Sequence, residues 1–205
     1  KDYEANDQTL EKIYELNRKY NAIAEEEEEI TRNVNWNLKR FSWDNLFNYG
    51  EGNSIDFTKL NGVVGVFGKN FSGKSSIIDG LLYAMYNSTS KNERKNLNII
   101  NQNKQMCSAD VEISVGDDTY SIHRESEKYL KKLKGEETLE AKTKTDFTKQ
   151  NLITQDVDVL NGTTRNETDK NIKKVLGTMD DFLMTSMSSQ MGSLSYINEG
   201  STSAE

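Results

Sequence analysis

The chain has 205 residues, a formal net charge of -7 at neutral pH and a hydrophobic content of 34%. That length suits one domain, with or without an extension. A mean hydropathy of -0.79 indicates either generous solvation or a missing part of the core, and we favour the second interpretation. One cysteine, Cys107, and one histidine, His123, exclude a disulfide framework and a structural zinc cluster.

The charge and the hydropathy profile also bear on partners and location. The negative charge argues against a uniformly basic nucleic-acid binder. No apolar run approaches the roughly 20 residues that span a bilayer, and no secretory signal begins the chain. We therefore expect an intracellular protein without a membrane partner, located in the cytoplasm or nucleoid, or in the nucleus of a eukaryote.

The first predicted element is a helix over residues 9–30, a stretch without proline or glycine that carries an imperfect apolar stripe. The acidic run 25–29 would repel itself across helical turns, so it reads as a solvated end and not as a metal site. We assign residues 1–33 to an N-terminal helical extension, the tail of a preceding domain. The chain begins with Lys1 and not with methionine, which favours a piece of a larger protein.

An antiparallel strand pair is predicted next, at residues 42–49 and 55–57. Aromatic residues are frequent in both segments, and Gly50, Gly52 and Asn53 supply turn chemistry between them. The apolar run 62–67 follows and suits a buried parallel strand.

The most informative segment is Gly68 to Ser76, which reads G-x-x-x-x-G-K-S-S. This pattern between a strand and a helix is typical of a phosphate-binding loop, whose backbone N–H groups face the phosphates of a nucleotide. Lys74 would reach the β- and γ-phosphates, and the Ser75 hydroxyl would coordinate Mg²⁺. The apolar positions after the loop repeat at helical spacing, from Ile77 to Met85. An α/β P-loop NTPase is the predicted fold class, with a mixed sheet and antiparallel β hairpins.

Basic residues cluster twice after this helix. The first cluster is Lys91, Arg94, Lys95 and Lys104, and the second is Arg124, Lys128, Lys131, Lys132 and Lys134. Either cluster could contact the DNA backbone, or both could be ordinary solvated faces.

A hairpin is predicted where Val111, Ile113 and Val115 alternate with polar residues and the pattern resumes at Tyr120 and Ile122. Residues 128–161 show no sustained period and predict surface strand or loop. Two helices follow, at 169–175 with Gly177 as the stop signal, and at 180–191. His123 at the hairpin is expected to be structural, and Cys107 to be small and partly buried.

The remaining motifs restrict the class of NTPase. The segment 103–106 lacks the aspartate of a guanine-binding N-K-x-D motif, which disfavours a GTPase. No run of four apolar residues after the loop ends in aspartate, so a convincing Walker B strand is absent from the sequence.

Residues 34–200 resemble the SMC-like ATPases of DNA double-strand-break repair, of the SbcC class, in the N-terminal half of their ABC-type ATPase head. The resemblance rests on the strand pair ending at 55–57, the phosphate loop 65–81, the hairpin end 120–124 and the segment 182–192. Phe71 departs from it, because the family has glycine there. We assign residues 34–205 to this half-head. A fused phosphoesterase nuclease is one candidate for the domain that precedes it, and the sequence leaves that choice open.

The resemblance implies a nucleotide site with named members. The residues that bind ATP would be Gly68, Lys69, Asn70, Gly73, Lys74, Ser75 and Ser76. Gln190 lies in the family's Q-loop. It would contact the Mg²⁺ that Ser75 holds, and it would also contact the attacking water. Lys74 and Gln190 would then be the catalytic residues. The implied partners are the C-terminal half of the same head, a second head in a homodimer, an SbcD-type metallophosphoesterase nuclease and double-stranded DNA.

Three functions fit these observations. The first is the ATP-binding half of an ATPase that drives DNA repair and is inactive alone. The second is a P-loop phosphotransferase for a small molecule, although the sequence offers no arginine cluster for an acceptor. The third is a module that holds nucleotide without turnover.

Overall fold

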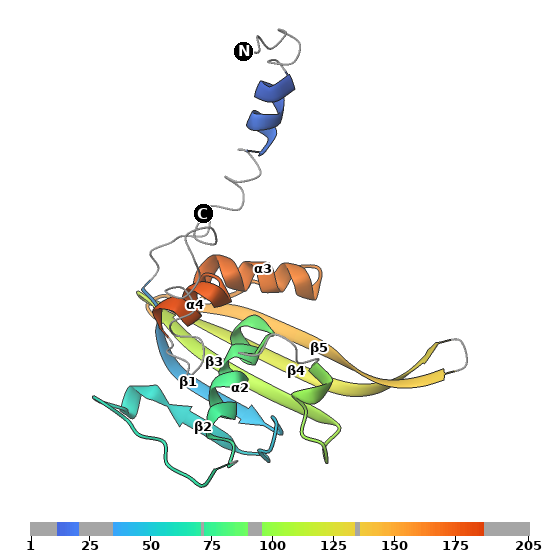
Figure 1. Ribbon diagram of the computed structural model, residues 1–205. Helices are drawn as coiled ribbons and strands as arrows, with labels where there is room; N and C mark the ends of the chain where they lie inside the picture. The colour runs from blue at the N-terminus through green and yellow to red at the C-terminus, as the bar shows by residue number, and fades with distance from the viewer. Residues whose placement is uncertain (1–11, 21–34, 71, 90–95, 134–135, 187–205) are drawn as a thin grey trace, which may run out of the picture.

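The computed structural model describes residues 12–20, 35–70, 72–89, 96–133 and 136–186 (Figure 1). Its centre is a six-stranded sheet in the order β2-β1-β3-β4-β5-β6. The strands are β1 (Asn37–Asp44), β2 (Asn53–Asp56), β3 (Met106–Val115), β4 (Asp118–Leu133), β5 (Glu136–Asn151) and β6 (Val157–Val159). Neighbouring strands of this sheet pair antiparallel throughout, so the mixed sheet expected from the sequence is wrong for the described residues.

Strands β1 and β2 confirm the predicted hairpin but shift its bounds. They pair from Arg40 opposite Asp56 to Trp43 opposite Asn53. Residues 45–49, expected to belong to the first strand, form the turn instead. The Asn45 N–H bonds the Gly50 carbonyl at 2.8 Å, which takes the chain out of the sheet. A short 3-10 helix, η1 (Phe57–Lys59), then ends the hairpin.

The expected buried strand at 62–67 is wrong in this structure. No strand is assigned there, and Val63 and Phe67 are 103% and 94% exposed. An apolar run becomes a strand only where another strand accepts and donates its backbone hydrogen bonds. Within the described residues no strand pairs with this segment.

The hairpin β3–β4 is confirmed, and its second strand is longer than predicted. Residues 128–161, which lack a clear period, contain the end of β4 together with β5 and β6. Strand β4 pairs with β5 over its full length, whereas β3 reaches only to Glu127. Beyond that residue β4 and β5 form a two-stranded ribbon that extends past the rest of the sheet (Figure 1).

One face of the sheet is apolar and is covered by helices. Helices α2 (Lys74–Tyr86) and α3 (Arg165–Leu176) pack on it, and a short 3-10 helix, η2 (Asn96–Asn98), lies near its edge. The sheet residues of the core include Phe41, Trp43, Cys107, Ala109, Val111, Ile113, Ile122 and Phe147. Alternate residues of the same strands point to the opposite face, which is polar.

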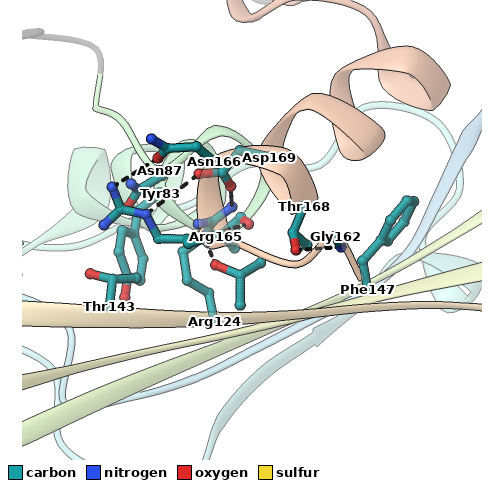
Figure 2. A network of polar contacts seen from close by, with 12 residues as sticks. Tyr83, Asn87, Arg124, Thr143, Phe147, Gly162, Arg165, Asn166, Thr168 and Asp169 are labelled. Carbon is teal, nitrogen blue, oxygen red and sulfur yellow. Dashed lines mark hydrogen bonds and ion pairs between the residues drawn. The ribbon is translucent and has the colours of Figure 1, made fainter. Parts of the chain in front are cut away.

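A buried arginine connects the sheet to two helices (Figure 2). The Arg124 side chain on β4 is fully buried. It donates to the Ala84 carbonyl of α2 at 3.1 Å, to Thr145 Oγ1 of β5 at 2.7 Å and to Asp169 Oδ1 of α3 at 2.8 Å. Burial lowers the pKa of this guanidinium, and the neighbouring Asp169 carboxylate acts in the opposite direction. Arg124 is therefore a structural residue, which removes it from the predicted basic surface.

The last two helices lie where the sequence predicts them, but their lengths differ from the prediction. Helix α3 contains the predicted 169–175 and ends at Gly177, whose φ of 80° is easily adopted only by glycine. Helix α4 (Met179–Thr185) covers the first part of the predicted 180–191 and is followed by Ser186 as its C-cap. Residues 187–191 lie outside the described part of the chain.

The N-terminal helix is confirmed over 12–20, where every residue is exposed. The other residues of the predicted 9–30 lie outside the described part, as does the proposed boundary at residue 33. In the described ranges, no helix has both the length and the apolar character needed to cross a membrane.

Candidate phosphate-binding site

The predicted phosphate loop lies directly before α2, with Lys74 as the first helical residue. The Lys74 Nζ donates to the carbonyls of Gly68 at 2.9 Å and Lys69 at 2.8 Å. The side chain thus folds back over the start of the loop. A Cβ on Gly68 would lie 2.8 Å from Ser72 Oγ, so the Ser72 side chain would have to shift to admit one.

The helix N-terminus behind the loop is open to an anion. Gly73 is its N-cap, with φ 91° and ψ 10°, and it provides no side-chain oxygen for the first N–H groups. The first turn holds no acidic residue. An uncapped N-terminus leaves N–H groups and the positive end of the helix dipole available, and these are what a phosphate requires.

The other predicted site residues are placed as follows. Asn70 and Ser75 are exposed at the loop and at the first helical turn, and Ser76 is partly buried beside them. The Ser76 N–H donates to the Gly73 carbonyl at 2.9 Å, which closes the first turn. Gln190 and Phe71 lie outside the described residues, so their predicted roles stay predictions.

Metal binding would depend on few protein ligands. Within the described residues no group of three or more His, Cys, Asp or Glu side chains could hold a metal ion. The exposed Ser75 hydroxyl fits the way that Mg²⁺ is usually held beside a nucleotide, where phosphates and waters fill most positions. Ser75 is therefore the described residue that could hold Mg²⁺.

Helix α2 sits close to the sheet, which fixes where its N-terminus points. Gly80 faces β1 and the following turn, and a Cβ on it would lie 3.1 Å from Leu46 Cδ1 and 3.2 Å from Phe41 Cζ. This close approach explains a glycine inside a helix, where it costs about 1 kcal/mol relative to alanine.

One contact of the loop was not predicted. The Tyr49 hydroxyl donates to the Gly73 carbonyl at 2.9 Å, and burial raises the pKa of this phenol. Sequence analysis predicted Tyr49 only as an aromatic residue of a strand. The signal that could have found it is its place beside a turn rich in glycine and asparagine, since loops between strands commonly carry site residues.

The predicted DNA-contacting clusters receive little support. In the second cluster Arg124 is buried, Lys131 pairs with Glu140 at 3.0 Å, and Lys132 pairs with Glu137 at 2.7 Å. From the first cluster Lys104 pairs with Glu51 at 2.9 Å, and Lys91, Arg94 and Lys95 lie outside the described residues. The pairing favours the alternative of a solvated face for the residues that the structure describes.

His123 and Cys107 have structural surroundings, as expected. The His123 Nδ1 lies 2.7 Å from Asp110 Oδ1 on the polar face of the sheet, and this hydrogen bond raises the pKa of the imidazole. Cys107 is 1% exposed, more buried than predicted, and burial raises the pKa of its thiol to about 11.

Comparison with known proteins identifies the kind of domain. A family model described as "AAA domain" matches residues 40–200, a range that contains the phosphate loop and all of the sheet except the first three residues of β1. The chain belongs to the AAA domain family. It is thus a P-loop ATPase domain, and the small-molecule kinase alternative is not favoured.

Three individual proteins show how far the similarity extends. The uncharacterized protein R555 of Acanthamoeba polyphaga mimivirus is 27% identical over 94% of this chain and 15% of its own length. The DNA double-strand break repair Rad50 ATPase of Sulfolobus acidocaldarius is 36% identical over 59 residues, which are 29% of this chain and 7% of that protein. A structure of the recombination mediator protein RecF with ATP superimposes with a TM-score of 0.40 and 16% identity over 54% of this chain and 28% of that one. The chain therefore spans only a small part of each relative.

Proposed function

We propose that this chain is the ATP-binding N-terminal half of an SMC-like ATPase head of the SbcC class. The complete protein would couple ATP binding and hydrolysis to DNA double-strand-break repair or end processing. The observation that carries the proposal is the Lys74 ammonium folded over an intact phosphate loop at the uncapped N-terminus of α2. The local similarity to a Rad50 ATPase supports DNA repair over other uses of such a loop.

In this proposal each site residue has a defined task. Backbone N–H groups of the loop that are not already bonded to loop carbonyls, as those of Ser72 and Ser76 are, receive the phosphates. The Lys74 ammonium exchanges its two carbonyl partners for β- and γ-phosphate oxygens, a charge-assisted interaction. Ser75 and Gln190 hold Mg²⁺, which neutralises charge on the phosphates, and Gln190 also orients the attacking water.

The proposed partners follow from what the described chain lacks. No described residue is a Walker B carboxylate, so we infer that the C-terminal half of the same head supplies it, and that a second head completes each site. The exposed apolar segment 62–67 supports this inference, because a partner strand would give its backbone hydrogen bonds and cover its side chains. Double-stranded DNA and an SbcD-type nuclease complete the proposed assembly.

The test of nucleotide binding is Lys74→Ala, measured by titration calorimetry with ATP and Mg²⁺. Loss of the ammonium removes the main cation from the phosphates, and we expect no measurable binding. Lys132→Ala is the matched control, because Lys132 is 76% exposed and pairs with Glu137 far along the ribbon. Equal ATP affinity of the wild type and Lys74→Ala would contradict the assignment.

A second test concerns turnover. The 205-residue chain alone should bind ATP and hydrolyse little or none, because the carboxylate for the metal is supplied elsewhere. Co-expression with the C-terminal half should restore steady-state hydrolysis, and Gln190→Ala in that assembly should lower hydrolysis far more than ATP binding. Rapid turnover by the isolated chain would show that the half-head assignment is wrong.

A further inference from the structure

The Tyr49 side chain touches the phosphate loop in two ways. Its hydroxyl donates to the Gly73 carbonyl at 2.9 Å. Its ring also lies against the same residue, since a Cβ on Gly73 would sit 3.4 Å from Tyr49 Cε2. The ring in turn meets Trp43 edge to face, with centroids 5.3 Å apart at 87°. Tyr49 is thus held between the core and the end of the loop.

The turn that carries Tyr49 has an uncommon backbone. Asn45 and Phe47 have φ values of 55° and 52°. A left-handed conformation is unfavourable for a bulky residue such as Phe47, and it persists only where surrounding contacts enforce it. Backbone strain of this kind is concentrated at functional sites.

The enforcing contacts come from the segment before β3. The Phe47 N–H donates to the Ile99 carbonyl at 2.7 Å, and the Asn101 N–H donates to the Asn45 carbonyl at 2.8 Å. The Asn101 side chain adds a bond from Nδ2 to the Tyr49 carbonyl at 3.0 Å. The backbone of Tyr49 is therefore fixed independently of the phosphate loop.

Gly73 is the residue whose conformation directs the loop. Its φ of 91° turns the chain from the loop into α2, and Lys74 follows it at once. Lys74 fastens the beginning of the loop through the Gly68 and Lys69 carbonyls. Tyr49 fastens the end of the loop at Gly73.

We propose that Tyr49 is a positioning residue for the nucleotide site, whose hydroxyl and ring hold Gly73 so that the loop N–H groups converge on the phosphates. The inference rests on the proposed ATP binding and adds to it a residue outside the loop motif. Tyr49 acts through Gly73 and does not itself take part in the chemistry. A preformed loop binds more tightly because less conformational entropy is lost when the nucleotide arrives.

The test compares Tyr49→Phe with wild type in the full 205-residue chain, using ATP with Mg²⁺ as the probe. Loss of one hydrogen bond that orders the loop should weaken ATP binding by about three- to tenfold. The Lys74 backbone amide, which is bonded to the Gly73 carbonyl carbon, should shift in ¹H–¹⁵N spectra recorded without nucleotide. The amide shift reports that the bond to Gly73 has been lost, and a merely stabilising role would leave ATP affinity unchanged relative to a matched control.

Tyr129→Phe is that control. The Tyr129 hydroxyl donates to the Glu140 carboxylate at 2.9 Å on the β4–β5 ribbon, so the same atom and one hydrogen bond are removed away from the loop. We expect Tyr129→Phe to bind ATP as wild type does, and the two variants to unfold at similar temperatures.

The outcomes separate the two proposals. If Lys74→Ala loses ATP while Tyr49→Phe keeps wild-type affinity, ATP binding stands and the role of Tyr49 is overturned. The role is also overturned if the two Tyr→Phe variants lose affinity equally, or if the Lys74 amide does not shift. If the wild-type chain binds no ATP, the proposed function fails and the inference fails with it.

Discussion

The N-termini of helices α2 and α4 are built in opposite ways. Helix α4 is closed by its own side chains: Thr178 accepts from the Asp181 N–H, and the Asp181 carboxylate accepts from the Thr178 N–H. Helix α2 begins at Gly73 with no side-chain cap and no acid in its first turn. A self-capped, acidic N-terminus repels anions, whereas a bare one attracts them. The helix end without a side-chain cap is therefore the one that follows the proposed phosphate loop.

The N-terminus of helix α3 is capped by a side chain, as that of α4 is. Thr164 caps it by accepting from the Glu167 N–H, and Glu167 adds an acid to the first turn. Hydrogen bonds from Thr163 lower the pKa of the Glu167 carboxyl, which keeps it charged. The N-termini of α3 and α4 thus have side-chain caps, and the N-terminus of α2 has none.

The largest expected effect comes from disconnecting α2 and α3, which Arg124 joins (Figure 2). Arg124→Ala removes a fully buried guanidinium that donates hydrogen bonds to both helices. The Asp169 Oδ1 atom then loses the hydrogen bond from Arg124. We expect unfolding in urea to show a loss of about 3–5 kcal/mol, the usual cost of removing one partner of a buried ion pair. Arg165→Ala is the control, because Arg165 lies 3.8 Å from the same carboxylate and its side chain is 42% exposed. This substitution should lower the free energy of unfolding by less than about 1 kcal/mol. Equal losses in the two variants would contradict the role given to Arg124.

The second effect tests the open helix end directly. Ser76→Glu places a carboxylate in the first turn of α2, as Glu167 does in α3. It should weaken ATP binding by about tenfold or more through repulsion, while stabilising the helix by about 0.3–1 kcal/mol through its dipole. Calorimetry and thermal unfolding on one preparation measure both quantities. Asn166→Asp, in the first turn of α3, is the control and should leave ATP affinity unchanged. If Ser76→Glu binds ATP as wild type does, the N-terminus of α2 is not the phosphate site.

A smaller effect is expected where a helix caps itself. Thr178→Ala removes the hydroxyl that accepts from the Asp181 N–H at 3.2 Å. Loss of an N-cap side chain costs about 1 kcal/mol, measured as the free energy of unfolding in urea. Thr178→Ser keeps the hydroxyl and should recover most of the loss. If alanine and serine behave alike, the cap contributes nothing to stability.

The smallest effect belongs to a charge pair that caps no helix. The hydrogen bond that Asp110 accepts raises the pKa of His123 in the folded state, so the pair stabilises the protein fully below the unfolded pKa of histidine. This contribution is lost as pH rises through the higher folded pKa. Because the two side chains are 42% and 53% exposed, it should stay below about 1 kcal/mol. Unfolding measured between pH 5 and 9 should show this decline in wild type and not in Asp110→Asn.

Sequence patterns alone predicted the glycine-rich loop 68–76, the helix that follows it and the β3–β4 hairpin. Each of these depends on local chemistry: glycines where the chain must turn, and apolar residues at the period of a helix or a strand. The AAA domain family agrees with the loop prediction. Gly177 was also predicted correctly as the stop signal of α3, because a positive φ favours glycine.

The tertiary structure alone decided which apolar and charged residues have partners. The run 62–67 reads as a strand, yet a strand exists only through hydrogen bonds to a neighbour, and sequence pattern does not reveal the neighbour. Arg124 reads as a basic surface residue, but Ala84, Thr145 and Asp169 bury it. Tyr49 reaches Gly73 only because distant residues of the chain fix its turn. Contacts between segments far apart in sequence depend on packing geometry, which local periodicity does not encode.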